Sequence, residues 1–150
     1  MKVILQKVKK ASVSVDGKIV GEIDKGYCLL VGVHKESTEA DAKYLAKKIV
    51  EARLFEDENE KLNLGLKDVN GSILSVSQFT LYADTKKGKR PSFTNAASAE
   101  EANELYSKFN EYLREEGIKV ETGIFQTMME VNIINDGPVT IIYEKLSLGN

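Results

Sequence analysis

Apolar and polar residues alternate in the first part of the chain in the pattern of paired β-strands. Residues 11–15 place an apolar side chain at every second position, after a short apolar run at 3–5. Asp16-Gly17 predicts a hairpin turn, because glycine tolerates the positive φ that the turn requires, and residues 18–23 are expected to form the returning strand. The more continuous apolar run at 27–33 indicates a strand buried on both faces.

Two later segments have apolar residues at helical spacing. The first begins near Thr38, where Ser37 or Thr38 can cap the helix. Its apolar stripe consists of Ala42, Leu45, Ala46, Ile49 and Val50. The second begins at Ser98, with Glu101 placed for a capping box, and Gly117 is the expected stop. Its stripe consists of Ala102, Leu105, Phe109, Tyr112 and Leu113.

The remaining segments complete the predicted order of elements. Residues 55–71 and 86–97 are expected to be loops, and residues 72–81 a strand. Three further strands are expected at 119–125, 128–134 and 139–146. This order predicts a single α/β domain of the α+β type over residues 1–150, with two main helices and a mixed, strongly curled or barrel-like sheet.

Composition and charge indicate the cellular compartment in which the protein works. The net charge is −2, so any contact with nucleic acid has to come from a local basic patch. The first residues carry charges where a signal peptide needs its apolar segment, and no apolar run approaches the roughly 20 residues that cross a bilayer. We therefore expect a cytoplasmic protein. The lone Cys28 lies in an apolar run and is expected to be a buried, inert thiol.

Several common catalytic arrangements do not fit this sequence. His34 is the only histidine, and a strand-end histidine without a catalytic role is its commoner interpretation. Histidine and cysteine are too few for a zinc site, and no phosphate-binding or dinucleotide-binding glycine motif is present, so we expect no metal and no cofactor. An enzyme built on this sequence would use backbone groups, hydroxyls or groups of the substrate.

Two segments are unusual for the elements in which they lie. Ser77, Gln78 and Thr80 interrupt a potential core strand, although cross-strand hydrogen bonding is the simpler interpretation of such residues. The segment 135–140, Asn-Asp-Gly-Pro-Val-Thr, lies between two predicted strands and is expected to be a turn. Only about 5–6% of X-Pro bonds are cis in folded proteins, so frequency alone predicts a trans bond before Pro138.

Taken together, the segments 77–81 (Ser-Gln-Phe-Thr-Leu) and 135–140 resemble the D-aminoacyl-tRNA deacylase family. The resemblance covers nearly the whole chain and includes residues 2–17, 53–55 and 87–93. At one place the sequence departs from the family pattern. Where the family often has Phe-Gly-Ala, one further residue and Met, Gln126 and Thr127 occupy the small positions.

The resemblance implies hydrolysis of the ester bond between a D-amino acid and the terminal adenosine of tRNA. Backbone N–H groups near Phe79 and Thr80 would stabilise the oxyanion, with the Thr80 hydroxyl as the alternative catalytic group. Ser77 and Gln78 would position the adenosine or support the strand. Phe125 and Met129 are candidates for the pocket near the adenine, and a position in the core is an equally good interpretation of both.

The resemblance also implies a homodimer with composite active sites. Gly137-Pro138, flanked by Asn135 and Thr140, would be a Gly-cisPro element whose carbonyls enter the partner subunit's pocket. These carbonyls would bind the substrate ammonium and exclude an L side chain. Glycine has no side chain to exclude, so glycyl-tRNA is expected to be a second substrate.

Four cations are expected to contact the acceptor end of the tRNA, although a solvated loop explains such a run equally well. They are Lys86, Lys87, Lys89 and Arg90. Two other functions remain open from the sequence: a non-catalytic RNA-binding module on the same fold, and a structural or regulatory dimer without tRNA affinity. An assay with D-Tyr-tRNA and L-Tyr-tRNA separates all three.

Overall fold

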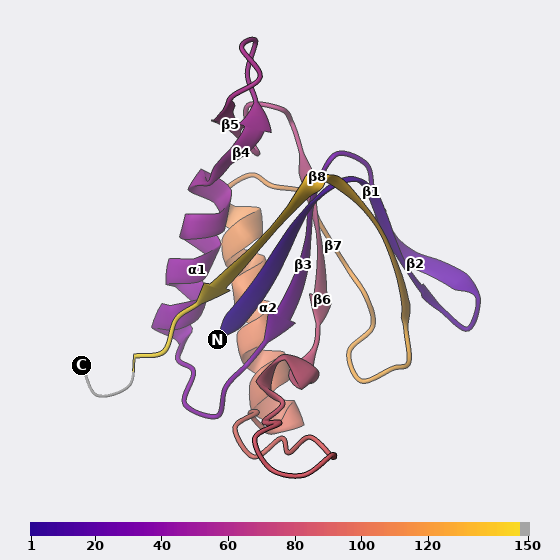
Figure 1. Cartoon of the computed structure of the whole chain (residues 1–150), viewed down its shortest axis with the longest axis vertical. Coiled ribbons are helices and arrows are strands. Elements are labelled where there is room, and N and C mark those ends of the chain that lie inside the picture. Colours follow the sequence, from indigo (N-terminus) through magenta and orange to yellow (C-terminus); the bar gives the residue numbers. More distant parts are fainter. Residues whose placement is uncertain (148–150) are drawn as a thin grey trace.

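A curled sheet and two helices form the protein, for which the computed structural model describes residues 1–147 (Figure 1). The helices α1 (Glu39–Glu51) and α2 (Ala99–Glu115) pack against each other on one side of the sheet. The strands of this sheet are β1 (Lys2–Val15), β2 (Lys18–Ile23), β3 (Gly26–Gly32), β6 (Ser72–Ser77), β7 (Val120–Thr122) and β8 (Glu130–Glu144). A separate hairpin consists of β4 (Arg53–Glu56) and β5 (Leu62–Gly65).

The long strand β1 gives the sheet its curl. The strand order is β2-β1-β3-β6-β7, and β8 pairs with the remaining edge of β1. The first half of β1 pairs with β3, and the second half pairs with β2, both antiparallel. β8 follows β1 over nearly its whole length, and Figure 1 shows it arching over the sheet. The pairs β3–β6 and β6–β7 are parallel, so the sheet is mixed, as the sequence predicts.

Two groups of buried side chains stabilise this arrangement. The larger lies between the sheet and the helices, and its fully buried members include Leu5, Leu29, Leu45, Ile49, Phe109 and Leu113. The smaller lies inside the curl and consists of Val8, Ala11, Val13, Ile23, Cys28, Leu74 and Val76. Burial of apolar surface on both sides of the sheet explains why β3 is a continuous apolar run.

Several predicted features are confirmed. Gly17 turns the first hairpin with φ +78°, and Thr38 caps α1 through a hydrogen bond from the N–H of Asp41. All five residues of the first predicted stripe are buried. Ser98 caps α2, and Gly117 follows its end with φ +85°. The stripe of α2 is only partly correct, because Leu105 and Tyr112 are partly buried, whereas Tyr106 and Asn110 are buried.

Four predicted boundaries are wrong. Residues 55–71 contain the β4–β5 hairpin as well as loop. The predicted strand 72–81 ends at Ser77, and a 3-10 helix, η1 (Phe79–Tyr82), follows it. β7 is only three residues long. Residues 128–134 and 139–146 are not separate strands joined by a turn, because β1 pairs with the chain on both sides of segment 135–140 and keeps it in one strand, β8.

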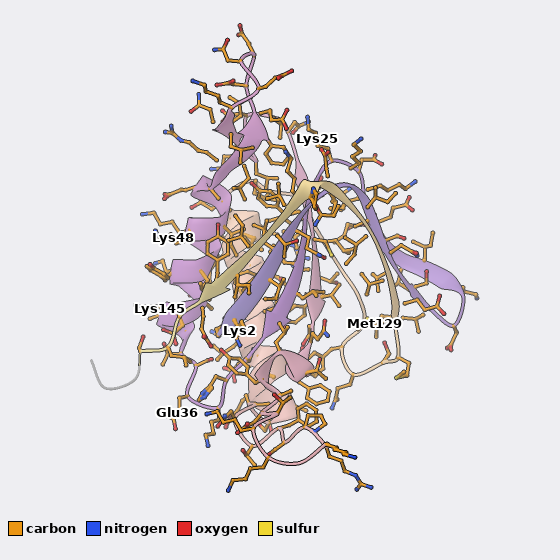
Figure 2. All side chains as sticks on the ribbon, viewed as in Figure 1. Lys2, Lys25, Glu36, Lys48, Met129 and Lys145 are labelled. Atoms are coloured by element: carbon orange, nitrogen blue, oxygen red, sulfur yellow. The ribbon has the colours of Figure 1, made fainter. Side chains whose placement is uncertain are left out.

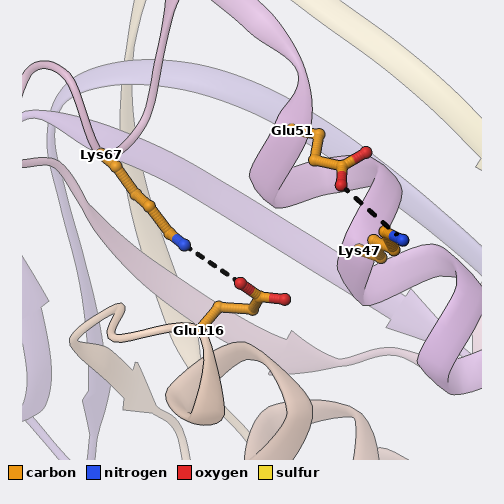
Figure 3. A network of polar contacts seen from close by, with 4 residues as sticks. All are labelled: Lys47, Glu51, Lys67 and Glu116. Atoms are coloured by element: carbon orange, nitrogen blue, oxygen red, sulfur yellow. Dashed lines mark hydrogen bonds and ion pairs between the residues drawn. The ribbon is translucent and has the colours of Figure 1, made fainter.

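Exposed ion pairs lie on the surface and do not determine the fold. Figure 3 shows Lys67 contacting Glu116 beyond the end of α2, with 3.0 Å between Nζ and Oε2, and Lys47 beside Glu51 on α1 at 4.0 Å. Such pairs typically contribute about 1 kcal/mol or less. Within residues 1–147, neither helix is long and apolar enough to cross a membrane.

Candidate active site

The polar segment after β6 is shaped by its contact with the end of β3. Gln78 is extended, with φ −145°, and its N–H donates a hydrogen bond of 2.8 Å to the carbonyl of Val31. The chain then turns into η1. Gly32 allows this packing, because an added Cβ would lie 2.9 Å from the Cβ of Leu81 and 3.3 Å from the carbonyl oxygen of Gln78. Any residue with a Cβ at position 32 would therefore displace η1.

The first turn of η1 presents unpaired backbone donors. Within residues 1–147, the N–H groups of Phe79 and Thr80 have no hydrogen-bond acceptor, as expected for the first residues of a helical turn. The side-chain amide of Gln78 donates a hydrogen bond of 2.9 Å to Oγ1 of Thr80. This places two main-chain donors and one oriented hydroxyl within two consecutive residues, Phe79 and Thr80.

These residues border a cavity of about 780 Å³. Its walls come from the ends of β3 and β6, from η1, from the start of α2 and from the loop before β8. Ser77, Gln78, Phe79 and Thr80 all line it, as do Phe125 and Met129. Figure 2 shows Met129 beside the beginning of β8. The volume lies within the usual range for a small-molecule site and would accommodate an aminoacyl nucleoside.

The loop before β8 forms the rim of this cavity. Gln126 has φ +62°, a backbone conformation that glycine adopts without strain, which accounts for the small residue in the family pattern. Thr127 donates from its hydroxyl to the carbonyl of Ile124 at 2.8 Å. Gln126 and Thr127 both line the cavity, so the departure from the pattern changes the side chains at its rim.

Two buried tyrosines, which the sequence analysis did not single out, form hydrogen bonds that hold the segment around residues 75–82 in place. Tyr106 of α2 donates a hydrogen bond of 2.6 Å to the carbonyl of Ser75, just before the site residues. The hydroxyl of Tyr82 donates to Glu144 of β8 at 3.0 Å, and Lys2 lies 5.0 Å from the centre of its ring. Burial and the hydrogen bond to Glu144 raise the pKa of Tyr82 well above its usual range.

The only cysteine and the only histidine do not line this cavity. Cys28 is fully buried, and burial raises the pKa of its thiol to about 12. His34 accepts a hydrogen bond at Nδ1 from the N–H of Glu36. Its partial burial, followed by nearby positive charges, lowers the pKa of His34. The burial expected for Cys28 is confirmed, and His34 lies just beyond the end of β3. Among residues 1–147, no cluster of three or more histidine, cysteine or acidic side chains could hold a metal.

Gly137 and Pro138 lie elsewhere on the chain. The bond between them is cis, so the expectation from frequency alone is wrong and the conformation implied by the resemblance is confirmed. Both residues are exposed on β8, in the irregular stretch opposite the middle of β1. Six strand residues, roughly 20 Å, separate Pro138 from Glu144, which contacts η1. Neither residue lines the cavity of its own chain, although Val131 of the same strand does.

Asn135 holds this irregular stretch in shape. Its Oδ1 accepts a hydrogen bond of 2.7 Å from the N–H of Val139, and its Nδ2 donates to the carbonyl of Val139 at 3.2 Å. Nδ2 also donates to Oγ1 of Thr140 at 3.1 Å. Asn135 and Thr140 thus fix the backbone on either side of Gly137-Pro138, and neither lines the cavity.

The basic loop, residues 85–91, is closed next to η1. Asp84 and Ser92 exchange two backbone hydrogen bonds of 2.7 and 2.9 Å at its base. Its four cations, Lys86, Lys87, Lys89 and Arg90, are exposed. None of them forms an ion pair with the residues that the structure describes, in contrast to Lys67 in Figure 3.

Comparison with known proteins relates this geometry to a family. The family described as D-Tyr-tRNA(Tyr) deacylase matches residues 4–144. The D-aminoacyl-tRNA deacylase of Staphylococcus haemolyticus is 62% identical over 144 residues, covering 96% of this chain and 95% of the relative. The D-aminoacyl-tRNA deacylase of Exiguobacterium sibiricum is 58% identical over 145 residues, covering 97% of this chain and 100% of the relative.

Solved structures agree in fold. The c-Myc DNA unwinding element binding protein has a TM-score of 0.90 and 39% identity, covering 97% of this chain and 99% of that chain. A probable eukaryotic D-amino acid tRNA deacylase has a TM-score of 0.82 at 16% identity, covering 95% of this chain and 97% of that chain, and shares the fold. With a family match over nearly its whole length and relatives close to 60% identical, this chain belongs to the D-aminoacyl-tRNA deacylases.

Proposed function

We propose that the chain hydrolyses D-aminoacyl-tRNA in the cytoplasm, with the N–H groups of Phe79 and Thr80 binding the oxyanion. The observation that carries this proposal is the pair of unpaired backbone donors at the wall of the cavity. Water attacks the ester carbonyl carbon, and the bond to the ribose oxygen breaks. The proton lost by the water reaches that ribose oxygen through the vicinal hydroxyl. A preorganised donor of this kind contributes about 3–4 kcal/mol.

A nucleophilic Thr80 has less support. Its Oγ1 accepts a hydrogen bond from Gln78, and no ionisable side chain among the described residues lines the cavity to act as a base. We assign Ser77 and Gln78 to positioning the terminal adenosine, and Phe125 and Met129 to packing near the adenine. Their shared position around the cavity supports these roles.

Chiral selection is assigned to Gly137-Pro138 of a second copy of the chain. Both residues are exposed and lie far along β8 from the cavity, which supports a site completed by a partner. In this proposal their carbonyls accept a hydrogen bond from the substrate ammonium and occupy the space of an L side chain. Asn135 and Thr140 keep the carbonyls in position through the hydrogen bonds around Val139.

Deacylation of D-Tyr-tRNA, L-Tyr-tRNA and glycyl-tRNA tests the proposal. We expect release of D-tyrosine and glycine, with the L ester resistant. A wild-type protein that binds tRNA but releases no amino acid would instead be a non-catalytic nucleic-acid-binding module, an alternative supported by the basic loop and by the name of one structural relative.

Gly137→Ala tests the selectivity element separately. Gly137 has φ +139°, and an added Cβ would lie 2.8 Å from Cγ2 of Val139, so the local backbone has to move. We expect the ratio of D to L hydrolysis to fall about tenfold or more. Gly117→Ala is the matched control, since Gly117 also has a positive φ but its added Cβ would meet nothing within 4 Å. An unchanged D/L ratio in Gly137→Ala removes this element from the mechanism.

A further inference from the structure

Phe79 presents an aromatic ring whose exposure is unusual for its size. Phe79 is 57% exposed, although it is one of the residues that line the cavity. Phe93 packs against one side of the ring, edge to face, with 4.9 Å between the ring centres. This contact restrains the Phe79 ring, and the rest of the ring faces solvent.

The restrained ring belongs to a residue that lines the cavity and contacts Phe93, the residue that follows the base of the basic loop. Phe93 follows Ser92, which closes the basic loop through its backbone hydrogen bonds to Asp84. The cavity, the Phe79–Phe93 pair and the four unpaired cations of the loop are therefore connected by short stretches of chain. An exposed ring beside unpaired cations is the combination that binds single-stranded nucleic acid, in which bases stack and phosphates meet positive charge.

We propose that the Phe79 ring stacks on the unpaired base that precedes the terminal adenosine, while the basic loop contacts the adjoining phosphates. This inference rests on the proposed function, which puts the terminal adenosine in the cavity. It gives Phe79 two separate tasks, since its N–H faces the reacting ester and its side chain binds the RNA. The site accepts different tRNAs, because every base has a face on which to stack.

The four cations favour RNA over an apolar protein partner as the occupant of this surface. Lys86, Lys87, Lys89 and Arg90 would lose hydration without compensation against an apolar surface, whereas phosphates pair with them. A second copy of this chain offers a net charge of only −2, spread over 150 residues.

Binding of unacylated RNA of increasing length isolates the stacking contact. The probes are adenosine 5′-monophosphate and the oligoribonucleotides CpA and CpCpA, titrated by calorimetry into the full-length wild type and into Phe79→Leu, Phe79→Tyr and Phe93→Leu. We expect the step from the mononucleotide to CpA to tighten Kd about tenfold in the wild type. Phe79→Leu should lose most of that step, Phe79→Tyr should keep it, and Phe93→Leu should weaken it.

Tyr44→Leu is the matched control, because Tyr44 is 45% exposed on α1 and does not line the cavity. It should leave the length series unchanged. Equal steps in wild type and Phe79→Leu, or no step in the wild type, would overturn the inference. A shift of the monomer–dimer equilibrium in Phe79→Leu, measured by sedimentation, would assign the ring to a subunit contact and also overturn it.

The two proposals fail in different ways. A wild type that shows the length-dependent step but does not deacylate D-Tyr-tRNA contradicts the proposed function and supports the stacking site. A wild type that deacylates D-Tyr-tRNA and keeps the same step after Phe79→Leu contradicts the stacking site alone.

Discussion

Gly32 is the residue on which the position of η1 depends most directly. It lies at the end of β3, where the missing side chain leaves room for Leu81 and for the carbonyl of Gln78. The backbone donors of Phe79 and Thr80 follow immediately after that carbonyl. A single methyl group added at position 32 would therefore displace the backbone of the candidate active site, without touching the substrate.

We expect Gly32→Ala to lower kcat/KM for D-Tyr-tRNA about tenfold, because displacements well under 1 Å misalign reacting groups. Gly65→Ala is the control, since its added Cβ would make only ordinary contacts, 3.4 Å or longer. Steady-state kinetics on both variants, checked by urea unfolding, measure the effect. Wild-type kinetics in Gly32→Ala would show that η1 does not need this close contact.

The residues of the site were accessible to sequence analysis to different degrees. Ser77, Gln78, Phe79 and Thr80 stand next to one another, so their association needed no knowledge of the fold. Tyr82 and Glu144 are 62 positions apart and meet only because β1 pairs with both β3 and β8. Tyr106 could have been found, since it lies four residues after Ala102 on the buried face of α2.

At the scale of elements, β8 and η1 are where local patterns failed. A segment with glycine and proline usually ends a strand, but pairing with β1 on both sides keeps β8 continuous. Residues 78–81 alternate like a strand, yet β3 ends at Gly32 and gives the chain no further partner after Val31 has bonded Gln78. In both cases distant backbone pairing overrides the local preference.

The basic loop is expected to act as an electrostatic element. Replacing Lys87 and Lys89 together by alanine should weaken tRNA binding and flatten the slope of log Kd against log salt by about 1 for each phosphate that the variant no longer neutralises. Lys47 and Lys48 on α1 give a control with the same change of charge. Filter binding at several salt concentrations measures both. Identical slopes in the two double variants would show that the basic loop is only a solvated surface and does not contact the tRNA phosphates.

Helix α1 is expected to lose stability in acid through Asp41. Burial alone would raise the pKa of this carboxyl, but hydrogen bonds from Ser147 and Thr38, with the nearby amino terminus, outweigh burial and lower it below its usual 3.8. The stabilisation is therefore present above about pH 4 and is lost as the pH falls below that value.

Asp41→Asn should cost about 1 kcal/mol at neutral pH and remove this part of the acid dependence. Urea unfolding between pH 7 and pH 3 measures it. Asp24→Asn is the control, because Asp24 is exposed and forms no side-chain bond to the described residues. An acid dependence equal to that of the wild type in Asp41→Asn would contradict the assignment.

At the scale of the whole molecule, the helices cover only one side of the sheet. On the other side Ile4 pairs with Ile142 of β8 and with Leu30 of β3, which makes an apolar row across three strands. Ile142 is 67% exposed at the end of this row. Such a surface is typical of a protein contact, and a second copy of the chain would cover it in the composite site proposed above.

Ile142→Lys should therefore convert the proposed dimer to a monomer and reduce deacylation in parallel, because each proposed composite site would lose its partner's Gly137-Pro138. Sedimentation velocity and the D-Tyr-tRNA assay report the two effects. Leu62→Lys, at a residue 51% exposed on the β4–β5 hairpin, should change neither. A fully active monomer in Ile142→Lys would exclude a site shared between subunits.

The complete burial of Cys28 has a consequence for how the protein withstands oxidants. Its thiol is the only one in the chain and is protonated at neutral pH, with a pKa of about 12, so the thiolate that peroxides and alkylating reagents attack is almost absent. The proposed mechanism relies on backbone donors and therefore offers thiol-directed reagents no catalytic thiol to modify. Thiol-alkylating reagents should therefore leave hydrolysis unchanged, whereas they inactivate enzymes with an exposed catalytic cysteine.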